Sequence, residues 1–351
     1  MTDECSECGE YAARGCTFCG SCGRGLAGPG KTHLGFAEII LVIACVAVML
    51  IAAFETLVMI WNSGDVFYFL SSKSYGLILI VPFPHEIFTL RGGALQAYWI
   101  LLDIIIIFCA GEGIRRFVSD TGSLRDIAKP GVAENTSAFW ITVSMSAAIF
   151  INVAVVLIAT IITQEEITTP DFGDNLSQMF LFADAAVWEE IIARVLYIGV
   201  PMTILSLIVT KKKESLKCLL GGFGMSKAAV AFIIISGVIF GLAHYPGWED
   251  QAWKVVGTGV MGMFLGYVFV RFGLYASILL HFINDYLSAF DWVGAGWAAG
   301  LVSLALLGIG LIATYYVVNR LWGSRGSIVS LPLFRNGYVK SDGQGWMSKG
   351  R

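Results

Sequence analysis

Eight long runs of apolar residues restrict the fold of this chain more than any other feature. About 20 apolar residues are enough for an α-helix to cross the hydrocarbon core of a bilayer. Hydrophobic residues make up 56% of the 351 residues and charged residues 14%, roughly half the charged share of an ordinary soluble domain. The sequence therefore predicts an all-α polytopic membrane protein. Its expected transmembrane helices, about eight, cover residues 36–61, 97–117, 138–162, 176–209, 228–245, 252–272, 274–290 and 295–321.

The charged loops predict how the chain is oriented. Lys and Arg follow the second, fourth and eighth runs, and Arg271 ends the sixth, whereas the loop after the third run is acidic. By the positive-inside rule we expect both termini in the cytoplasm. We expect this multi-pass protein in the plasma membrane. Residues 62–96 fit no full span, because the apolar stretch at 75–83 is short and is interrupted by Pro82 and followed by Pro84. We predict an outer re-entrant or interfacial segment there.

The N-terminal segment contains paired cysteines with metal-ligand spacing. Cys5/Cys8 and Cys19/Cys22 are each CxxC, and glycine follows the second cysteine of each pair. Four thiolates in two such turns form a tetrahedral Zn²⁺ site, so we predict a structural zinc there. Cys16 offers an alternative second pair with Cys19, and a disulfide or a redox pair stays open as an alternative to zinc. The expected domains are a zinc ribbon at 1–30, a transmembrane domain at 36–321 and a flexible cytoplasmic tail at 322–351.

Charged residues inside the fourth apolar run point to a function. Glu189, Glu190 and Arg194 lie within residues 176–209, where an unpaired charge costs several kcal/mol. Four residues separate Glu190 from Arg194, so the two can pair on one face of a helix, while Glu189 lies about 100° around the helix. One carboxylate is then neutralised and the other is available. The alternative is a salt bridge between helices without chemistry. Asp184 is a further candidate for the same cavity.

Two histidines lie in apolar helices further along the chain. His244 ends the fifth predicted helix, one turn after Phe240. His281, Asn284 and Asp285 have i, i+3 and i+4 spacing, so all three project from one face of the seventh predicted helix. At 1.5 Å per residue, His281 and the glutamate pair reach a similar depth, whereas His244 is expected nearer the outer side.

Taken together, these motifs resemble those of the CPBP intramembrane proteases, the family of type II CAAX prenyl endopeptidases and of bacteriocin-processing or immunity proteins. The resemblance covers about residues 176–290, a protease-like core. It is carried by Glu189-Glu190-x-x-x-Arg194, Phe240-x-x-x-His244, Arg271-x-Gly273 and His281-x-x-x-Asp285, in this order.

The resemblance implies hydrolysis of peptide bonds inside the membrane. Glu189 would act as general base, and His244 would position the attacking water. His281 together with residue 285 would stabilise the oxyanion, while Glu190 and Arg194 would hold the site together. The expected partners are the lipid bilayer and a membrane-embedded or lipidated protein or leader peptide as substrate, and nucleic acid is not expected.

Position 285 leaves the chemistry open. An ionised Asp285 only accepts hydrogen bonds, so it is protonated, or Asn284 donates in its place, or Asp285 orients His281. The last arrangement would also suit a catalytic Zn²⁺ held by Glu189, His244 and His281, with one position open for water. Metal-free catalysis by Glu189 is the other option. A non-catalytic scaffold or immunity protein of the same fold is the competing function. A proton-coupled transporter is the third, although the helices do not divide into two similar halves.

Overall fold

The computed structural model describes residues 35–80, 83–122, 132–164, 170–210, 213–245 and 252–323. The predicted ribbon cysteines Cys5, Cys8, Cys19 and Cys22, and nearly all of the predicted tail, lie outside these residues.

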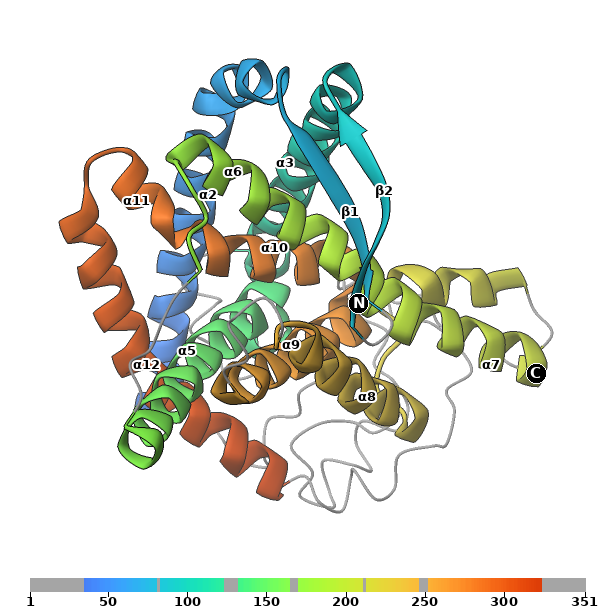
Figure 1. Ribbon diagram of the computed structural model, residues 1–351. Coiled ribbons are helices and arrows are strands. Elements are labelled where there is room, and N and C mark those ends of the chain that lie inside the picture. The colour runs from blue at the N-terminus through green and yellow to red at the C-terminus, as the bar shows by residue number, and fades with distance from the viewer. Residues whose placement is uncertain are drawn as a thin grey trace.

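All eight predicted membrane segments are helical in the structure (Figure 1). Six helices within the described residues are long and apolar enough to cross a membrane, so the protein is a multi-pass membrane protein. The remaining two segments, α8 and α10, are shorter. The segments are α2 (Phe36–Leu70), α3 (Gly93–Thr121), α5 (Ser137–Thr163), α6 to α7 (Asn175–Thr210), α8 (Lys227–Ala243), α9 (Ala252–Phe272), α10 (Leu274–Asp285) and α12 (Gly296–Gly323). Short helical turns complete the chain at Ala133–Asn135, Lys213–Leu220, Tyr286–Ser288 and α11 (Ala289–Trp292).

The fourth segment, called here helix 175–210, changes its winding where the charged residues lie. It begins as α6 (Asn175–Asp184) and ends as α7 (Val200–Thr210), and both Ala185–Glu189 and Ile191–Gly199 between them are π-helical. Asp174 caps its start, because the carboxylate accepts a 2.8 Å hydrogen bond from the backbone N–H of Ser177. A π-helical turn is rare and is found mostly at functional sites.

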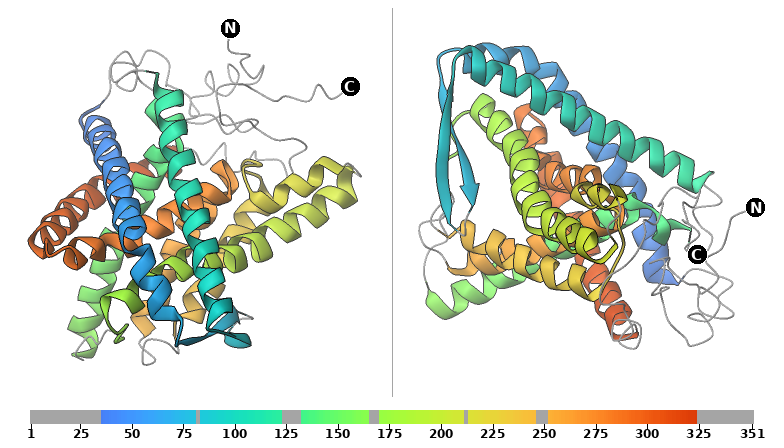
Figure 2. Two further views of the ribbon diagram at one scale, coloured as in Figure 1. Left: turned by 90° about the horizontal axis from the view of Figure 1, so that it is seen from above. Right: turned by 90° about the vertical axis from the view of Figure 1, so that its right-hand side faces the viewer.

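A β-hairpin occupies the segment for which we predicted a re-entrant or interfacial structure. Strands β1 (Ser74–Ile80) and β2 (Pro84–Arg91) pair antiparallel, with an irregularity between Leu77 and Ile78. As predicted, this segment adds no ninth span. Pro84 is tolerated as the first residue of β2, where a missing backbone N–H costs little. Figure 2 shows the hairpin running along the outside of the helices.

Asp184 ties the hairpin to the helices. Its carboxylate accepts hydrogen bonds from the hydroxyls of Tyr75 in β1, at 2.7 Å, and Tyr98 in α3, at 2.5 Å. Asp184 is buried and both of its oxygens are bonded. It therefore joins helix 175–210, β1 and α3.

Close contact between α8 and α9 sets the position of the end of α8. Gly237 and Gly241 in α8 face Gly259 and Gly262 in α9, and an added Cβ at Gly241 would approach the Cα of Gly259 to 3.0 Å. Small residues at such spacing let two helix backbones approach closely inside a membrane. The contact fixes α8 just before its C-terminal cap, His244.

Candidate active site

Glu190 and Arg194 form a fully buried ion pair. The Nε of Arg194 lies 3.0 Å from Oε2 of Glu190, as the spacing of four residues predicts. Arg194 also donates a 2.7 Å hydrogen bond to the hydroxyl of Ser236 in α8, which in turn donates to the carbonyl of Ala193 at 2.6 Å. The guanidinium lies 5.0 Å from the centre of the Phe240 ring. Arg194 thus links helix 175–210 to α8.

The same carboxylate joins helix 175–210 to α10. Oε1 of Glu190 lies 3.0 Å from Nδ1 of His281, and Oε2 accepts a hydrogen bond from the hydroxyl of Ser277. With Arg194 on its third side, this buried carboxylate is paired and hydrogen-bonded throughout, as a charge in a membrane interior must be. Glu190 therefore bonds residues of both helix 175–210 and α10, including Nδ1 of His281.

Glu189 has different surroundings. About a quarter of its side chain is exposed, yet its Oε2 is buried and has no hydrogen-bond partner among the described residues. This oxygen lies 3.9 Å from Nε2 of His244 and 4.0 Å from Nε2 of His281. These distances are too long for direct hydrogen bonds but suit groups bridged by a water molecule. The three predicted residues therefore come together, although they lie on three helices.

His244 presents one ring nitrogen to this position. Its Nδ1 lies 2.8 Å from the carbonyl oxygen of Phe240. A carbonyl only accepts hydrogen bonds, so this contact assigns the proton of the neutral ring to Nδ1 and leaves a lone pair on Nε2, facing Glu189. We predicted His244 nearer the outer side of the membrane. The prediction took α8 as a full span, but 17 residues rise only about 25 Å, which is less than the core thickness of ~30 Å.

His281 has a carboxylate beside each ring nitrogen. Its Nδ1 contacts Glu190, and its Nε2 lies 3.3 Å from Oδ2 of Asp285. Asn284 donates a 2.9 Å hydrogen bond to Oδ1 of Asp285. Of the three roles open for Asp285, this arrangement favours orientation of His281. Between two acceptors, the protonated ring donates from both nitrogens, and its positive charge suits it to stabilise a developing negative charge.

Residues 174–287 match the model of the Rce1-like type II CAAX prenyl endopeptidases. The chain carries an Rce1-like domain. No curated protein and no solved structure matches the chain. The matched residues start at the cap of helix 175–210 and end just beyond α10, so they include every group of the candidate site. The match relates this part of the chain to type II CAAX prenyl endopeptidases.

The site of the Rce1-like domain does not fit a catalytic zinc as it stands. Tetrahedral ligands at about 2.0–2.1 Å from Zn²⁺ lie about 3.4 Å from one another, whereas Oε2 of Glu189 is 3.9 and 4.0 Å from the two histidine nitrogens. Within the described part of the chain, no group of three or more His, Cys, Asp or Glu side chains could hold a metal ion. The side chains of Glu189, His244 and His281 are therefore the groups available for catalysis at this site.

Two serines of the Rce1-like domain belong to the site but were not predicted from the sequence. Ser277 lies four residues before His281, and Ser236 lies four before Phe240, so each shares a helix face with a predicted site residue. Both hydroxyls are buried and bond the ion pair. Their spacing was a usable signal, but a serine in an apolar helix more often bonds to its own backbone.

Proposed function

We propose that this protein is an intramembrane endopeptidase in which Glu189 activates water for attack on a peptide bond. The proposal depends mainly on one observation: Oε2 of Glu189 has no hydrogen-bond partner among the described residues and faces Nε2 of both His244 and His281. A carboxylate that only stabilised the fold would be expected to have its own donor, as Glu190 has.

The proposed reaction begins with a water held between Glu189 and His244. The water donates one proton to Glu189 and the other as a hydrogen bond to Nε2 of His244, and its oxygen attacks the scissile carbonyl carbon. The Nε2–H of protonated His281, which also faces Asp285, is shared with the resulting oxyanion. Protonated Glu189 then transfers its proton to the leaving nitrogen as the C–N bond breaks. General acid–base catalysis of this kind contributes about 10²–10⁴-fold, and one oxyanion donor contributes about 10²–10³-fold.

The substrate class proposed is a membrane-associated peptide, either lipidated or embedded as a segment. The match to type II CAAX prenyl endopeptidases favours a prenylated C-terminal peptide as the first to test. The non-catalytic scaffold is disfavoured because a scaffold needs no unpartnered carboxylate beside two imidazoles. The transporter relay from Glu189 through Asp184 is disfavoured because Tyr75 and Tyr98 bond both oxygens of Asp184.

The test uses the purified full-length protein in liposomes with two fluorogenic probes. One is a farnesylated Cys-aliphatic-aliphatic-X peptide, and the other is an unlipidated transmembrane peptide. We expect cleavage of at least one probe by the wild-type protein and by Glu112→Gln, a matched change in a carboxylate at the far end of α3 that pairs with Arg115 and Arg116. Glu189→Gln and His281→Ala should abolish it. Cleavage that survives both changes would exclude the proposed site.

We also propose that Cys5, Cys8, Cys19 and Cys22 bind one structural Zn²⁺ in a ribbon that recruits partners or regulates the membrane domain. The spacing of the cysteines supports this proposal. A site with four thiolate ligands has no open coordination position, so the ribbon is not expected to take part in the cleavage itself.

A further inference from the structure

Strand β1 runs beside the candidate catalytic residue, and its edge faces helix 175–210. The indole N–H of Trp188, the residue before Glu189, donates a 2.7 Å hydrogen bond to the carbonyl of Ile78. The hydroxyl of Tyr197 donates to the carbonyl of Ile80. Backbone groups point alternately to the two sides of a strand, so carbonyls two residues apart lie on the same edge. The sheet has two strands, so within the described residues β1 has one edge without a strand partner, and side chains of helix 175–210 bond the carbonyls of Ile78 and Ile80.

The two donors are side chains in places where a neighbouring strand would supply backbone N–H groups. An unpaired edge presents N–H and C=O groups at strand spacing, and an extended peptide that pairs with it gains main-chain hydrogen bonds whatever its sequence. Trp188 and Tyr197 stand on either side of the glutamate pair in sequence, and both donate to β1. A peptide paired with this edge would therefore run past Glu189.

The Ile80 end of the hairpin is held by few apolar contacts, which is what an edge that opens would require. A small apolar cluster of Ile80, Ile192 and Ala243, with a few partly buried neighbours, attaches its end to helix 175–210 and α8. This cluster is separate from the main core. Nearly all of β2 is exposed or half-buried, so β2 adds little to the attachment.

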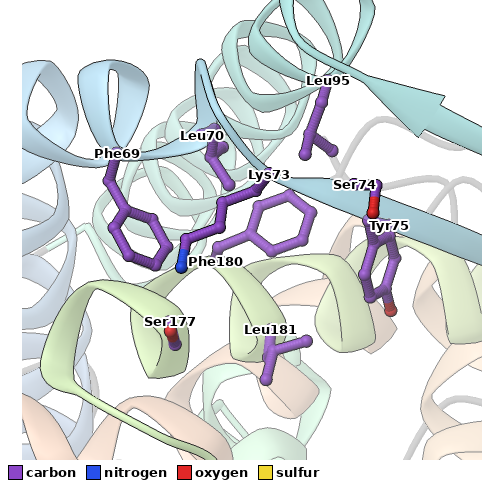
Figure 3. A pocket seen from close by; sticks show the side chains of 9 residues that line it. All are labelled: Phe69, Leu70, Lys73, Ser74, Tyr75, Leu95, Ser177, Phe180 and Leu181. Atoms are coloured by element: carbon purple, nitrogen blue, oxygen red, sulfur yellow. The ribbon is translucent and has the colours of Figure 1, made fainter.

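A cavity lies under the other end of the hairpin (Figure 3). Its volume is about 140 Å³, and β1 contributes Ser74 and Tyr75 to its lining, opposite Phe180 and Leu181 of α6. Atoms that border a void lose contacts on one side. The base of β1 borders this void, and Tyr75 holds it there through its ring contact with Phe180 and its hydrogen bond to Asp184.

We propose that the edge of β1 facing helix 175–210 binds the substrate peptide as an added strand, whose backbone N–H groups replace the indole of Trp188 and the hydroxyl of Tyr197. This inference builds on the proposed function and specifies how that site recognises its substrate. A helical substrate segment keeps its N–H groups bonded within itself, so it cannot pair with β1. Pairing therefore selects an extended substrate backbone and presents an extended peptide bond to Glu189.

The first experiment alters the peptide and leaves the protein unchanged. Each amide on the N-terminal side of the scissile bond of the best-cleaved probe is N-methylated in turn. We expect kcat/KM to fall at least tenfold at every second position and less than threefold at the positions between, which serve as matched controls. Losses without this alternation, or no losses at all, would overturn the proposal.

The second experiment removes the two donors. Tyr197→Phe and Trp188→Phe keep an aromatic ring but remove the group that bonds β1. If these groups occupy the place of the substrate, KM should fall threefold or more, because the peptide no longer competes with them. If they only hold the hairpin in place, KM should rise, and the proposal fails.

Failure of the proposed function is distinguishable from failure of strand addition. Uncleaved parent probes would refute the endopeptidase. In that event, binding of the parent and N-methylated farnesylated peptides to the wild-type protein, measured by fluorescence anisotropy in the same liposomes, still tests the edge. A period-two loss of binding supports strand addition, and binding without that period, or no binding, overturns it.

Discussion

Removal of Arg194 should destabilise the protein far more than removal of an exposed arginine. Arg194→Met deletes a guanidinium that pairs with Glu190 at 3.0 Å and bonds Ser236 at 2.7 Å, with no part of either ion-pair side chain exposed. Breaking a buried ion pair by removing one partner leaves an uncompensated charge, at a cost of about 3–5 kcal/mol. The matched control is Arg115→Met, since Arg115 pairs with Glu112 at 2.7 Å but is 62% exposed. Exposed pairs contribute about 0–1 kcal/mol.

The measurement is reversible unfolding by sodium dodecyl sulfate in mixed micelles, followed by tryptophan fluorescence. We expect the free energy of unfolding to fall by about 3–5 kcal/mol for Arg194→Met and by less than about 1 kcal/mol for Arg115→Met. Adding Glu190→Gln to Arg194→Met removes the orphaned charge and should recover about 0.5–3 kcal/mol. Equal losses for the two arginine variants, or no recovery in the double variant, would refute the account of Glu190 as a paired structural group.

Three further predictions concern other parts of the chain. Gly241→Ala should lower kcat/KM by roughly 10–100-fold, because the added methyl separates α8 from α9 and moves His244. The control is Gly308→Ala, where the space is open, and it should leave kcat/KM unchanged. Glu55→Leu should raise the free energy of unfolding by roughly 1–3 kcal/mol in the same titration, because this fully buried carboxyl has no hydrogen-bond partner among the described residues. Cys5→Ser with Cys8→Ser should reduce bound zinc from one ion per chain to none by elemental analysis, while cleavage persists; bound zinc that survives the change, or cleavage lost with it, would contradict the structural role of the ribbon.

Hydropathy was sufficient to predict the helices, because each must satisfy its own backbone groups within the membrane. Periodicity was sufficient for pairs within one helix. Glu190 and Arg194 meet as their spacing requires, and so do His281 and Asp285. In both pairs the interacting groups are four residues apart, so their geometry depends on the helix alone.

Contacts between segments could not be predicted in this way. The meeting of Glu190 with His281 depends on how helix 175–210 packs against α10, and the sequence contains no measure of that packing. The hairpin was not predicted because its strands are short and because proline, here Pro84, is typical of irregular segments. The π-helical turns were missed because an extra residue in a turn leaves no mark on hydropathy.

The two adjacent glutamates have different neighbours because successive residues point in different directions around one helix. Glu190 has Arg194, His281 and a serine hydroxyl within bonding reach, so its charge is fixed in place. Glu189 has two imidazole nitrogens at water-bridging distance and no bonding partner on Oε2 among the described residues. Both residues are already glutamates, so a different residue type would not exchange their neighbours. A change in the winding of the helix would be needed. A variant that restores α-helical winding around residues 185–199 while keeping both glutamates should therefore fold but lose cleavage.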